Sequence, residues 1–275
     1  MTRRPTSIDF LLDPNDLRRW HALPITHPVV APGFDLRIRR APRRTRAPAG
    51  SDLLFALERL LARGLGETAV DRLEAATLSR FAPAERTADL TIDLLGEEVV
   101  APDRQTITLR CDGGPVVDGA LAAVLDGRTP ILTAEYTAPG RNHTVARWPV
   151  AVEDRRSALR SVSLVAGRAA HLVALMIAEI AAGADPAGLD LHRADGEAGE
   201  GAPVPHRAPL GFFLAAFADR VAGRLARLVG REAPTWATAW RFRDAVSPDD
   251  RFDLDRTPFL RLPDDGARLF AHPFP

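Results

Sequence analysis

Two strand-like runs near the N-terminus, separated by one short helical segment, constrain the fold more than any other feature. Residues 7–12 (SIDFLL) form the first run, and residues 34–41 (FDLRIRRA) form the second, along which apolar residues alternate. Between them, residues 13–15 (DPN) end the first run and provide an Asn or Asp cap for a helix that passes through Trp20. Strand, helix and strand at this spacing predict a βαβ unit and therefore a parallel sheet.

The alternation of strand-like and helical segments continues to residue 183, so we predict an α/β fold with a Rossmann-like parallel sheet. The helix expected over residues 51–67 has an apolar face of four leucines: Leu54, Leu57, Leu60 and Leu61. Further strands are predicted at residues 88–96, 105–114, 128–137 and 143–152, and further helices at residues 68–81, 117–127 and 157–183.

The basic residues are all arginine, because the chain contains no lysine among its 36 basic residues. This excludes a Schiff-base or pyridoxal-phosphate lysine, a P-loop lysine and a kinase-type catalytic lysine. Acidic residues also number 36, so no net charge favours nucleic acid or an anionic membrane as a partner. Cys111 is the only cysteine, which excludes an intramolecular disulfide and a cysteine-based metal cluster.

The N-terminal residues lack the apolar core of a secretory signal. The longest apolar run, residues 169–178, is shorter than the ~20 residues of a membrane span. We therefore expect a cytoplasmic protein with no transmembrane segment. The basic, proline-flanked residues 41–50 (APRRTRAPAG) suggest a phosphate-binding loop, but the balanced charge and the lack of interleaved aromatic residues favour a solvated loop.

The C-terminal third has a different character. Residues 184–208 are rich in Gly, Ala, Pro and Asp and have no periodicity, which predicts a flexible linker. Residues 209–231 predict an amphipathic helix, with arginines lying off its apolar stripe. Such a helix can lie on a membrane surface, but Phe212 and Phe213 widen its apolar face, which favours packing against protein. The stripe consists of Leu214, Phe217, Val221, Leu225 and Leu228.

The last forty residues contain two aromatic motifs. The first consists of Trp236, Trp240 and Arg241; the second consists of Gly266, Phe270, Ala271, Pro273 and Phe274, with His272 at a position where an acid would stand. Together they resemble the opening of the glycosidase-like β-propeller of glucosamine inositolphosphorylceramide transferase-type proteins. In bacterial members of that family a degenerate formyltransferase-like domain precedes the propeller, and residues 7–183 resemble this domain in the order of their elements.

The resemblance implies a domain organisation. Residues 1–183 would be a degenerate formyltransferase-like α/β domain, residues 184–208 a linker, and residues 209–231 an amphipathic helix. Residues 232–275 would form a partial β-hairpin of a first propeller blade. Because one partial blade cannot bury its faces alone, we expect a truncated or split gene product, or a propeller domain or subunit that completes the blade in cis or in trans.

The residues that perform formyl transfer are not found where the resemblance would place them. Folate-dependent formyltransferases use an Asn-x-His pair after a sheet strand, in which Asn stabilises the oxyanion and His moves a proton. The corresponding strand here ends in Cys111, Asp112 and Gly113. No cofactor is therefore assigned; 10-formyltetrahydrofolate or a nucleotide sugar is the ligand that an active member would take.

Ligands of parallel sheets bind beyond the carboxyl ends of the strands. This rule selects Asp13, Asp93, Asp112 and Gly113 as ligand-binding candidates, although acids at these positions also cap helices and turns. The adjacent pair Asn142–His143 is a further catalytic candidate with Asp112, in a loop near the ligand crevice or in a plain turn.

No metal site, Ser-His-Asp arrangement or dinucleotide fingerprint is predicted from the sequence. His171 has no partner one turn away and is expected to be a packed histidine. Three functions remain: a degenerate module that binds or positions a small molecule or glycan for a propeller, an active divergent formyl- or glycosyltransferase, and a stand-alone interaction module.

Overall fold

The structure, a computed structural model, forms two units, Met1–Ala216 and Phe217–Pro275. It describes residues 7–26, 34–43, 50–61, 66–78, 81–83, 88–97, 104–152, 157–191, 209–228, 239–240 and 260–261.

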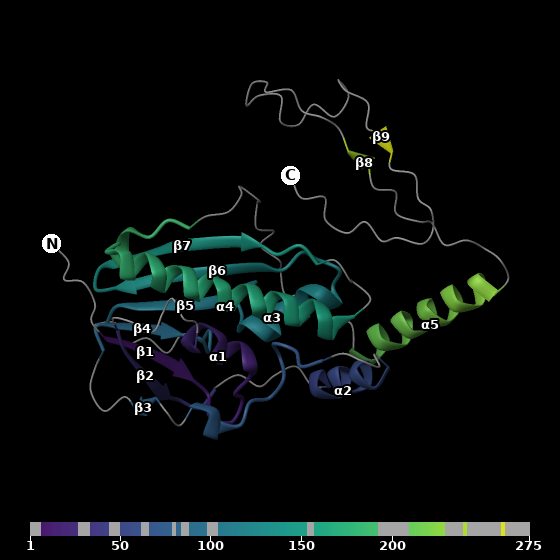
Figure 1. The fold of residues 1–275 in the computed structure, drawn as a ribbon, viewed down its shortest axis with the longest axis horizontal. Coiled ribbons are helices and arrows are strands. Elements are labelled where there is room, and N and C mark those ends of the chain that lie inside the picture. The colour runs from purple at the N-terminus through teal and green to yellow at the C-terminus, as the bar shows by residue number, and fades with distance from the viewer. Residues whose placement is uncertain are drawn as a thin grey trace. The chain divides into compact units, whose positions relative to one another are not determined.

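A seven-stranded sheet in the order β3-β2-β1-β4-β5-β6-β7 forms the centre of the first unit (Figure 1). Its strands are β1 (Ser7–Leu12), β2 (Asp35–Arg40), β3 (Ala82–Pro83), β4 (Leu90–Asp93), β5 (Thr106–Cys111), β6 (Ile131–Ala138) and β7 (Arg141–Pro149). The strands from β3 to β5 pair in parallel, as the sequence predicts. The parallel prediction is wrong for β6, which pairs antiparallel with both β5 and β7. After α3 the chain re-enters the sheet at the edge where β5 ends, with Leu132 beside Cys111, and the tight turn at Pro139–Gly140 then makes β6 and β7 a hairpin.

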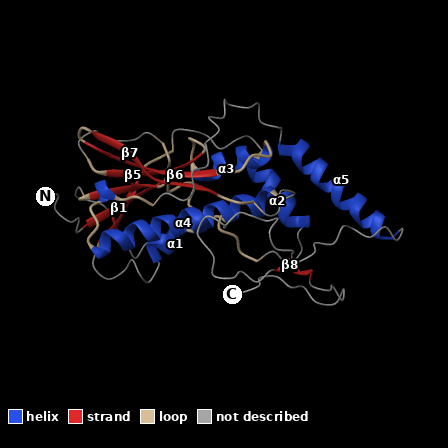
Figure 2. Ribbon diagram, turned by 90° about the horizontal axis from the view of Figure 1, so that it is seen from above, coloured by secondary structure: helices blue, strands red, loops and turns tan. Residues whose placement is uncertain are grey.

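In the described part of this unit, four α-helices accompany the sheet: α1 (Arg19–Thr26), α2 (Ser51–Leu61), α3 (Val116–Leu125) and α4 (Ala158–Ala182). The long helix α4 lies along one face of the sheet, with α1 beside it (Figure 2), and α1, α2 and α3 all pack against α4. The main core is formed between this helical layer and alternate residues of the strands, such as Phe10, Ile92 and Leu109.

The other face of the sheet is polar. Register pairing places Asp9, Thr91 and Thr106 side by side across β1, β4 and β5 on this face. Asp9 is fully buried, and its carboxylate lies 3.1 Å from Nε of Arg37 and 2.7 Å from Nη2 of Arg39 on the neighbouring strand. A one-residue slip of β1 would move this carboxylate into the apolar core, so the pairs fix the register.

The N-terminus of α4 is capped by a side chain from α2. The Ser157 hydroxyl accepts a bond from the Arg160 N–H at 3.3 Å. The buried Glu58 carboxylate accepts the N–H groups of Ala158 and Leu159, at 2.9 and 2.8 Å, and the Ser157 hydroxyl at 2.8 Å. These bonds satisfy donors that a helix leaves unpaired in its first turn.

Among the described residues, α4 alone is long and apolar enough to cross a membrane, with a mean hydropathy of 1.7 over its best window. Its continuous helix is longer than the apolar run counted in the sequence. More than half of that window (56%) is buried inside the protein, and a core helix meets the same criteria.

Two helix predictions need correction. In the segment 68–81, the described residues 68–78 and 81 do not form a helix apart from the four-residue 3₁₀ turn η1 (Ala75–Leu78). The carbonyls of Ala69 and Asp71 instead accept the N–H groups of Trp20 and Arg19, at 2.9 Å each, and so cap α1. In α2 the predicted leucine face is correct for the buried Leu54 but wrong for the exposed Leu60 and Leu61. The other buried residues of the helix are Ser51, Phe55 and Glu58.

After α4, the chain up to Leu191 remains bonded to strand β7. The turn η2 (Pro186–Gly188) is followed by Leu191, whose N–H donates to the carbonyl of Val145 and whose carbonyl accepts the indole N–H of Trp148. Residues 192–208 of the predicted linker lie outside the described residues.

Helix α5 (Pro209–Leu228) forms where an amphipathic helix was predicted. In the second unit, β8 (Ala239–Trp240) pairs antiparallel with β9 (Leu260–Arg261). The other residues of the two aromatic motifs, Trp236, Arg241 and the positions from Gly266 onward, lie outside the described residues.

Candidate functional site

The carboxyl edge of the sheet contains a switch point between β1 and β4. From β1 the chain continues to β2 on one side, and it later returns to β4 on the other side. Loops leave in opposite directions at such a point and open a crevice, which is where open α/β sheets bind ligands. Here the crevice is almost filled: a cavity of about 20 Å³ remains, lined by residues that include Asp13, His21, Arg43, Leu95 and Val116. This volume holds about one water molecule.

The guanidinium of Arg43 fills the crevice. It pairs with Asp118, and it lies 3.4 Å from Asp16 and 3.6 Å from Glu97. The Arg43 side chain is 11% exposed, so these pairs are largely removed from water. Burial raises the pKa of the Asp118 carboxyl, and Arg43 partly opposes that rise. A cation of the chain itself thus occupies the position of a ligand.

Asp13 lies at the crevice, as the topological rule predicts, but its carboxylate is used for structure. Oδ1 accepts the N–H of Asn15 at 2.8 Å, and Oδ2 accepts the N–H of Arg43 at 3.0 Å. These bonds join the loop after β1 to the loop after β2. Asp13 therefore positions Arg43 rather than presenting its charge to a ligand.

His21 forms the inner wall of the crevice. Its Nδ1 accepts the N–H of Arg18 at 3.0 Å, which fixes the neutral tautomer with the proton on Nε2. Burial, followed by the charges of Arg18 and Arg43, lowers the pKa of His21 to about 3. A histidine that stays neutral over the physiological range is a poor proton carrier, so its role here is packing and capping.

Asp93 ends β4 on the polar face of the sheet and does not line the cavity. Its Oδ1 accepts the N–H of Leu95 at 2.8 Å, while Oδ2 is buried and receives no hydrogen bond from the described residues. Burial raises the pKa of this carboxyl to about 7, against the opposing effects of backbone N–H groups and Arg110. A buried carboxyl that titrates near neutrality is the most perturbed acid at this edge.

Asp112 and Gly113 form a tight turn after β5. Their φ angles of 45° and 78° are those of a two-residue Asp-Gly turn, closed by hydrogen bonds between Cys111 and Gly114. The Asp112 carboxylate lies 3.5 Å from Arg128. Gly113 therefore allows the backbone conformation of the turn, and neither Asp112 nor Gly113 lines the crevice cavity.

The end of β5 also packs tightly against α3. A Cβ at Gly119 would lie 1.8 Å from the Cys111 carbonyl oxygen, so only glycine permits this contact. The Cys111 thiol is fully buried, and burial raises its pKa well above the usual range. It is therefore not a nucleophile.

Asn142 and His143 lie at the opposite edge of the sheet. They belong to β7, where Asn142 pairs with Thr137, and Thr137 in turn pairs with Thr106 at the start of β5. The expected loop near the crevice is thus wrong, because β6 runs antiparallel and carries this hairpin away from Asp112. The His143 ring packs on Tyr136 with centroids 5.3 Å apart.

Sequence reasoning missed the residues that fill the crevice. Arg43 was predicted to lie in a solvated loop and is instead buried among carboxylates. The available signal was the pair of acids after β1, Asp13 and Asp16, which need a counter-charge if the edge is buried. Within the described ranges, no three His, Cys, Asp or Glu side chains form a group that could hold a metal ion.

Comparison of the chain with protein-family models, with curated proteins and with solved structures gives no match.

Proposed function

We propose that this chain is a non-catalytic, formyltransferase-like module that binds or positions a small molecule or glycan for a sugar- or glycan-transferring partner. The observation that carries the proposal is the Arg43 guanidinium in the switch-point crevice, held by Asp16, Glu97 and Asp118. A formyl-folate or a nucleotide sugar would have to displace a buried cation and take from Asp118 its ion-pair partner, which is costly.

The end of β5 supports the same conclusion. Formyl transfer needs a group that stabilises an oxyanion and a group that moves a proton. This strand instead offers a buried neutral thiol at Cys111 and a turn at Asp112–Gly113 whose carboxylate pairs with Arg128. Neither arrangement supplies the two roles.

Helix α5 supports a positioning role through contact with a partner. Four of its apolar residues, spaced as one helical stripe, are 39–56% exposed: Leu214, Phe217, Val221 and Leu225. An exposed stripe of this kind is typical of a surface that packs against protein. The partner we propose is a propeller domain or subunit, in cis or in trans, and the same stripe supports the alternative of a stand-alone interaction module.

The test uses the full chain and a ligand panel. Thermal unfolding is followed with saturating 10-formyltetrahydrofolate and with a set of nucleotide sugars, and we expect no shift of the melting temperature with either class. A saturable shift of the melting temperature that is lost in the Asp13→Asn variant would refute the conclusion that the crevice is closed to ligands. Native mass of the gene product from its own cell then shows whether a propeller-containing partner co-purifies.

A divergent enzyme is the second candidate, and Asp93 favours it. Its buried carboxyl, with a pKa of about 7 and one oxygen without a partner among the described residues, has the properties of a general acid or base. This candidate requires saturable binding of a formyl-folate or nucleotide sugar, and turnover that follows the titration of one group near pH 7 and disappears in Asp93→Asn.

A further inference from the structure

The outer side of α4 borders an open groove of about 590 Å³, which lies between this helix and the segment 67–69. The groove shares no lining residue with the switch-point cavity, so it is separate from the crevice. Its volume falls within the range of roughly 300–1,000 Å³ that is usual for ligand sites. One wall is fixed, because the Ser163 hydroxyl accepts the N–H of Ala69 at 2.8 Å and ties the segment to α4.

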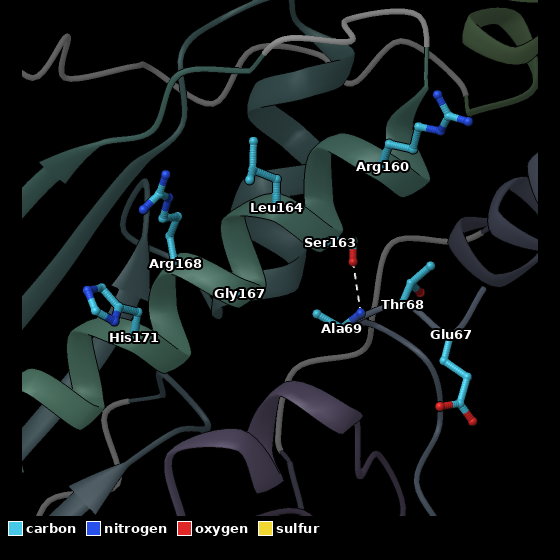
Figure 3. A pocket seen from close by; sticks show the side chains of 9 residues that line it. All are labelled: Glu67, Thr68, Ala69, Arg160, Ser163, Leu164, Gly167, Arg168 and His171. Carbon is cyan, nitrogen blue, oxygen red and sulfur yellow. Dashed lines mark hydrogen bonds between the residues drawn. The ribbon is translucent and has the colours of Figure 1, made fainter. Parts of the chain in front are cut away.

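One end of the groove holds a basic pair, Arg168 and His171. Both residues are exposed, and Figure 3 shows their side chains extending to the same side of α4. Residues three apart on a helix are neighbours, with Cβ atoms about 5–6 Å apart. One small anion can therefore contact the guanidinium and the imidazole together. The His171 ring also packs on Trp148, at a centroid distance of 6.2 Å, which restricts its movement.

The charge of Arg168 is available to a ligand. Among the residues that the structure describes, no acid forms an ion pair with Arg168. The one acid in the lining, Glu67, forms an ion pair with Arg19 instead. The other arginine of the lining, Arg160, already has an interaction partner and lies about two helical turns from Arg168, so it takes no part in this site.

An apolar strip continues from the basic pair along the groove. Leu164 is 36% exposed and lies one helical turn before Arg168 on the same side of α4. At Gly167 an added Cβ would meet no atom within 4 Å, so the space beside the helix backbone is open between Leu164 and His171. Ala69 adds an apolar side chain from the opposite wall.

A basic pair next to an apolar strip fits a small amphipathic acid. We propose that Arg168 and His171 bind one carboxylate or phosphate group, and that the apolar body of the same ligand lies over Gly167 and against Leu164. A guanidinium binds either anion through paired N–H donors, and an imidazole N–H adds a further donor. Because the groove is separate from the crevice, failure of this site would leave the proposed function unaffected.

Other ligand classes fit less well. A metal ion or an organic cation would need a free carboxylate, and the one acid of the lining is already paired. Nucleic acid would need a broader basic surface with stacking groups, whereas the imidazole of His171 is the one aromatic side chain in this lining. A neutral lipid or alcohol would leave the charge of Arg168 without an anion.

The experiment follows the backbone amide shifts of the full chain by two-dimensional NMR during titration with octanoate and with octyl phosphate. We expect saturable shifts around Arg168 and His171, with a Kd between about 0.1 and 1 mM for the better acid. Arg168→Gln should weaken binding at least about tenfold, because it removes a charge-assisted hydrogen bond. Arg160→Gln, the matched loss of an arginine from the other end of the groove, should leave Kd unchanged.

The length of the ligand tests the apolar part of the site. Each buried CH₂ group strengthens binding by roughly fourfold, so octanoate should bind at least about tenfold more tightly than butyrate. In Gly167→Phe, whose ring fills the open space, this advantage should be lost. Gly167→Ala adds one methyl group in the same space and should retain it.

Comparison of the two acids identifies the anionic group: tighter binding of octyl phosphate assigns a phosphate monoester, and tighter binding of octanoate assigns a carboxylic acid. Three results would overturn the proposal. The first is equal affinity for neutral octanol, and the second is a loss of affinity in Arg160→Gln as large as that in Arg168→Gln. The third is the absence of saturable shifts with either acid up to about 10 mM. Amide shifts away from the groove that match those of the unmodified chain show that each variant is folded.

Discussion

Replacing Asp93 by asparagine should make the folded protein more stable at alkaline pH. The ordinary pKa of the carboxyl is 3.8, and burial raises it to about 7 in the folded protein. Between these values the folded protein holds a proton that the unfolded chain has released, so the free energy of unfolding falls as pH rises from about 4 to 7. At 1.36 kcal/mol per pKa unit, the total loss is roughly 4 kcal/mol.

The asparagine side chain of the Asp93→Asn variant is neutral at every pH, and its oxygen can still accept the Leu95 N–H that Asp93 accepts at 2.8 Å. Equilibrium urea unfolding of both proteins between pH 4.5 and 8.5 measures the effect. We expect nearly equal stability at the acid end and an advantage of up to about 4 kcal/mol for Asp93→Asn above pH 7.

His21 produces a slope of opposite sign, because its pKa is lowered from 6.5 to about 3 and the unfolded chain takes up a proton first as pH falls. Stability from this group is lost below pH 6.5 in both proteins. Subtracting one curve of unfolding free energy against pH from the other removes this shared contribution and leaves the contribution of Asp93. A constant difference over the whole pH range, or a less stable variant at pH 8, would refute the argument.

Further substitutions test particular contacts by urea unfolding. Arg43→Ala removes an ion-pair partner of the buried Asp118, so we expect a loss of about 3–5 kcal/mol at pH 8 and a smaller loss at acid pH, because burial raises the pKa of Asp118 and its protonated form needs no cation; a pH-independent loss would contradict this. Glu58→Ala removes the acceptor of the first α4 N–H groups and should cost about 2–3 kcal/mol, with Glu58→Gln recovering part. Gly119→Ala places a methyl group against the Cys111 carbonyl and should cost more than ~2 kcal/mol, whereas Gly167→Ala should stabilise by up to ~1 kcal/mol.

Local patterns predicted the parallel half of the sheet. β1, α1 and β2 form close to the residues expected, because their apolar spacing acts within a few residues. The predicted cap at residues 13–15 is wrong, because α1 begins at Arg19 and is capped by the carbonyls of Ala69 and Asp71. The helix predicted at residues 68–81 failed for a long-range reason: its carbonyls bond to the start of α1. Periodicity within one segment contains no information about such a partner.

The candidate site was predicted less well than the fold. The topological rule included Asp13, which lines the cavity at the switch point. It could not show that Arg43 folds back between three carboxylates, because that arrangement depends on loops after three different strands. Similarly, the buried face of α2 is set by Glu58, whose partners begin 99 residues further along the chain.

The crevice also lies on the boundary between two parts of the sheet that we expect to assemble at different times. The β6–β7 hairpin closes across the two residues Pro139–Gly140, whereas β1 and β4 are separated by a long segment that contains α1, β2, α2 and β3, and the Ser7–Asp89 bond spans 82 residues. Hairpins form within about 1–10 μs, and non-local parallel pairing must first overcome the entropy of loop closure. Because the Arg43 cluster spans the β1–β4 boundary, we expect it to be completed only when the two parts of the sheet have joined, with its carboxylates hydrated until then.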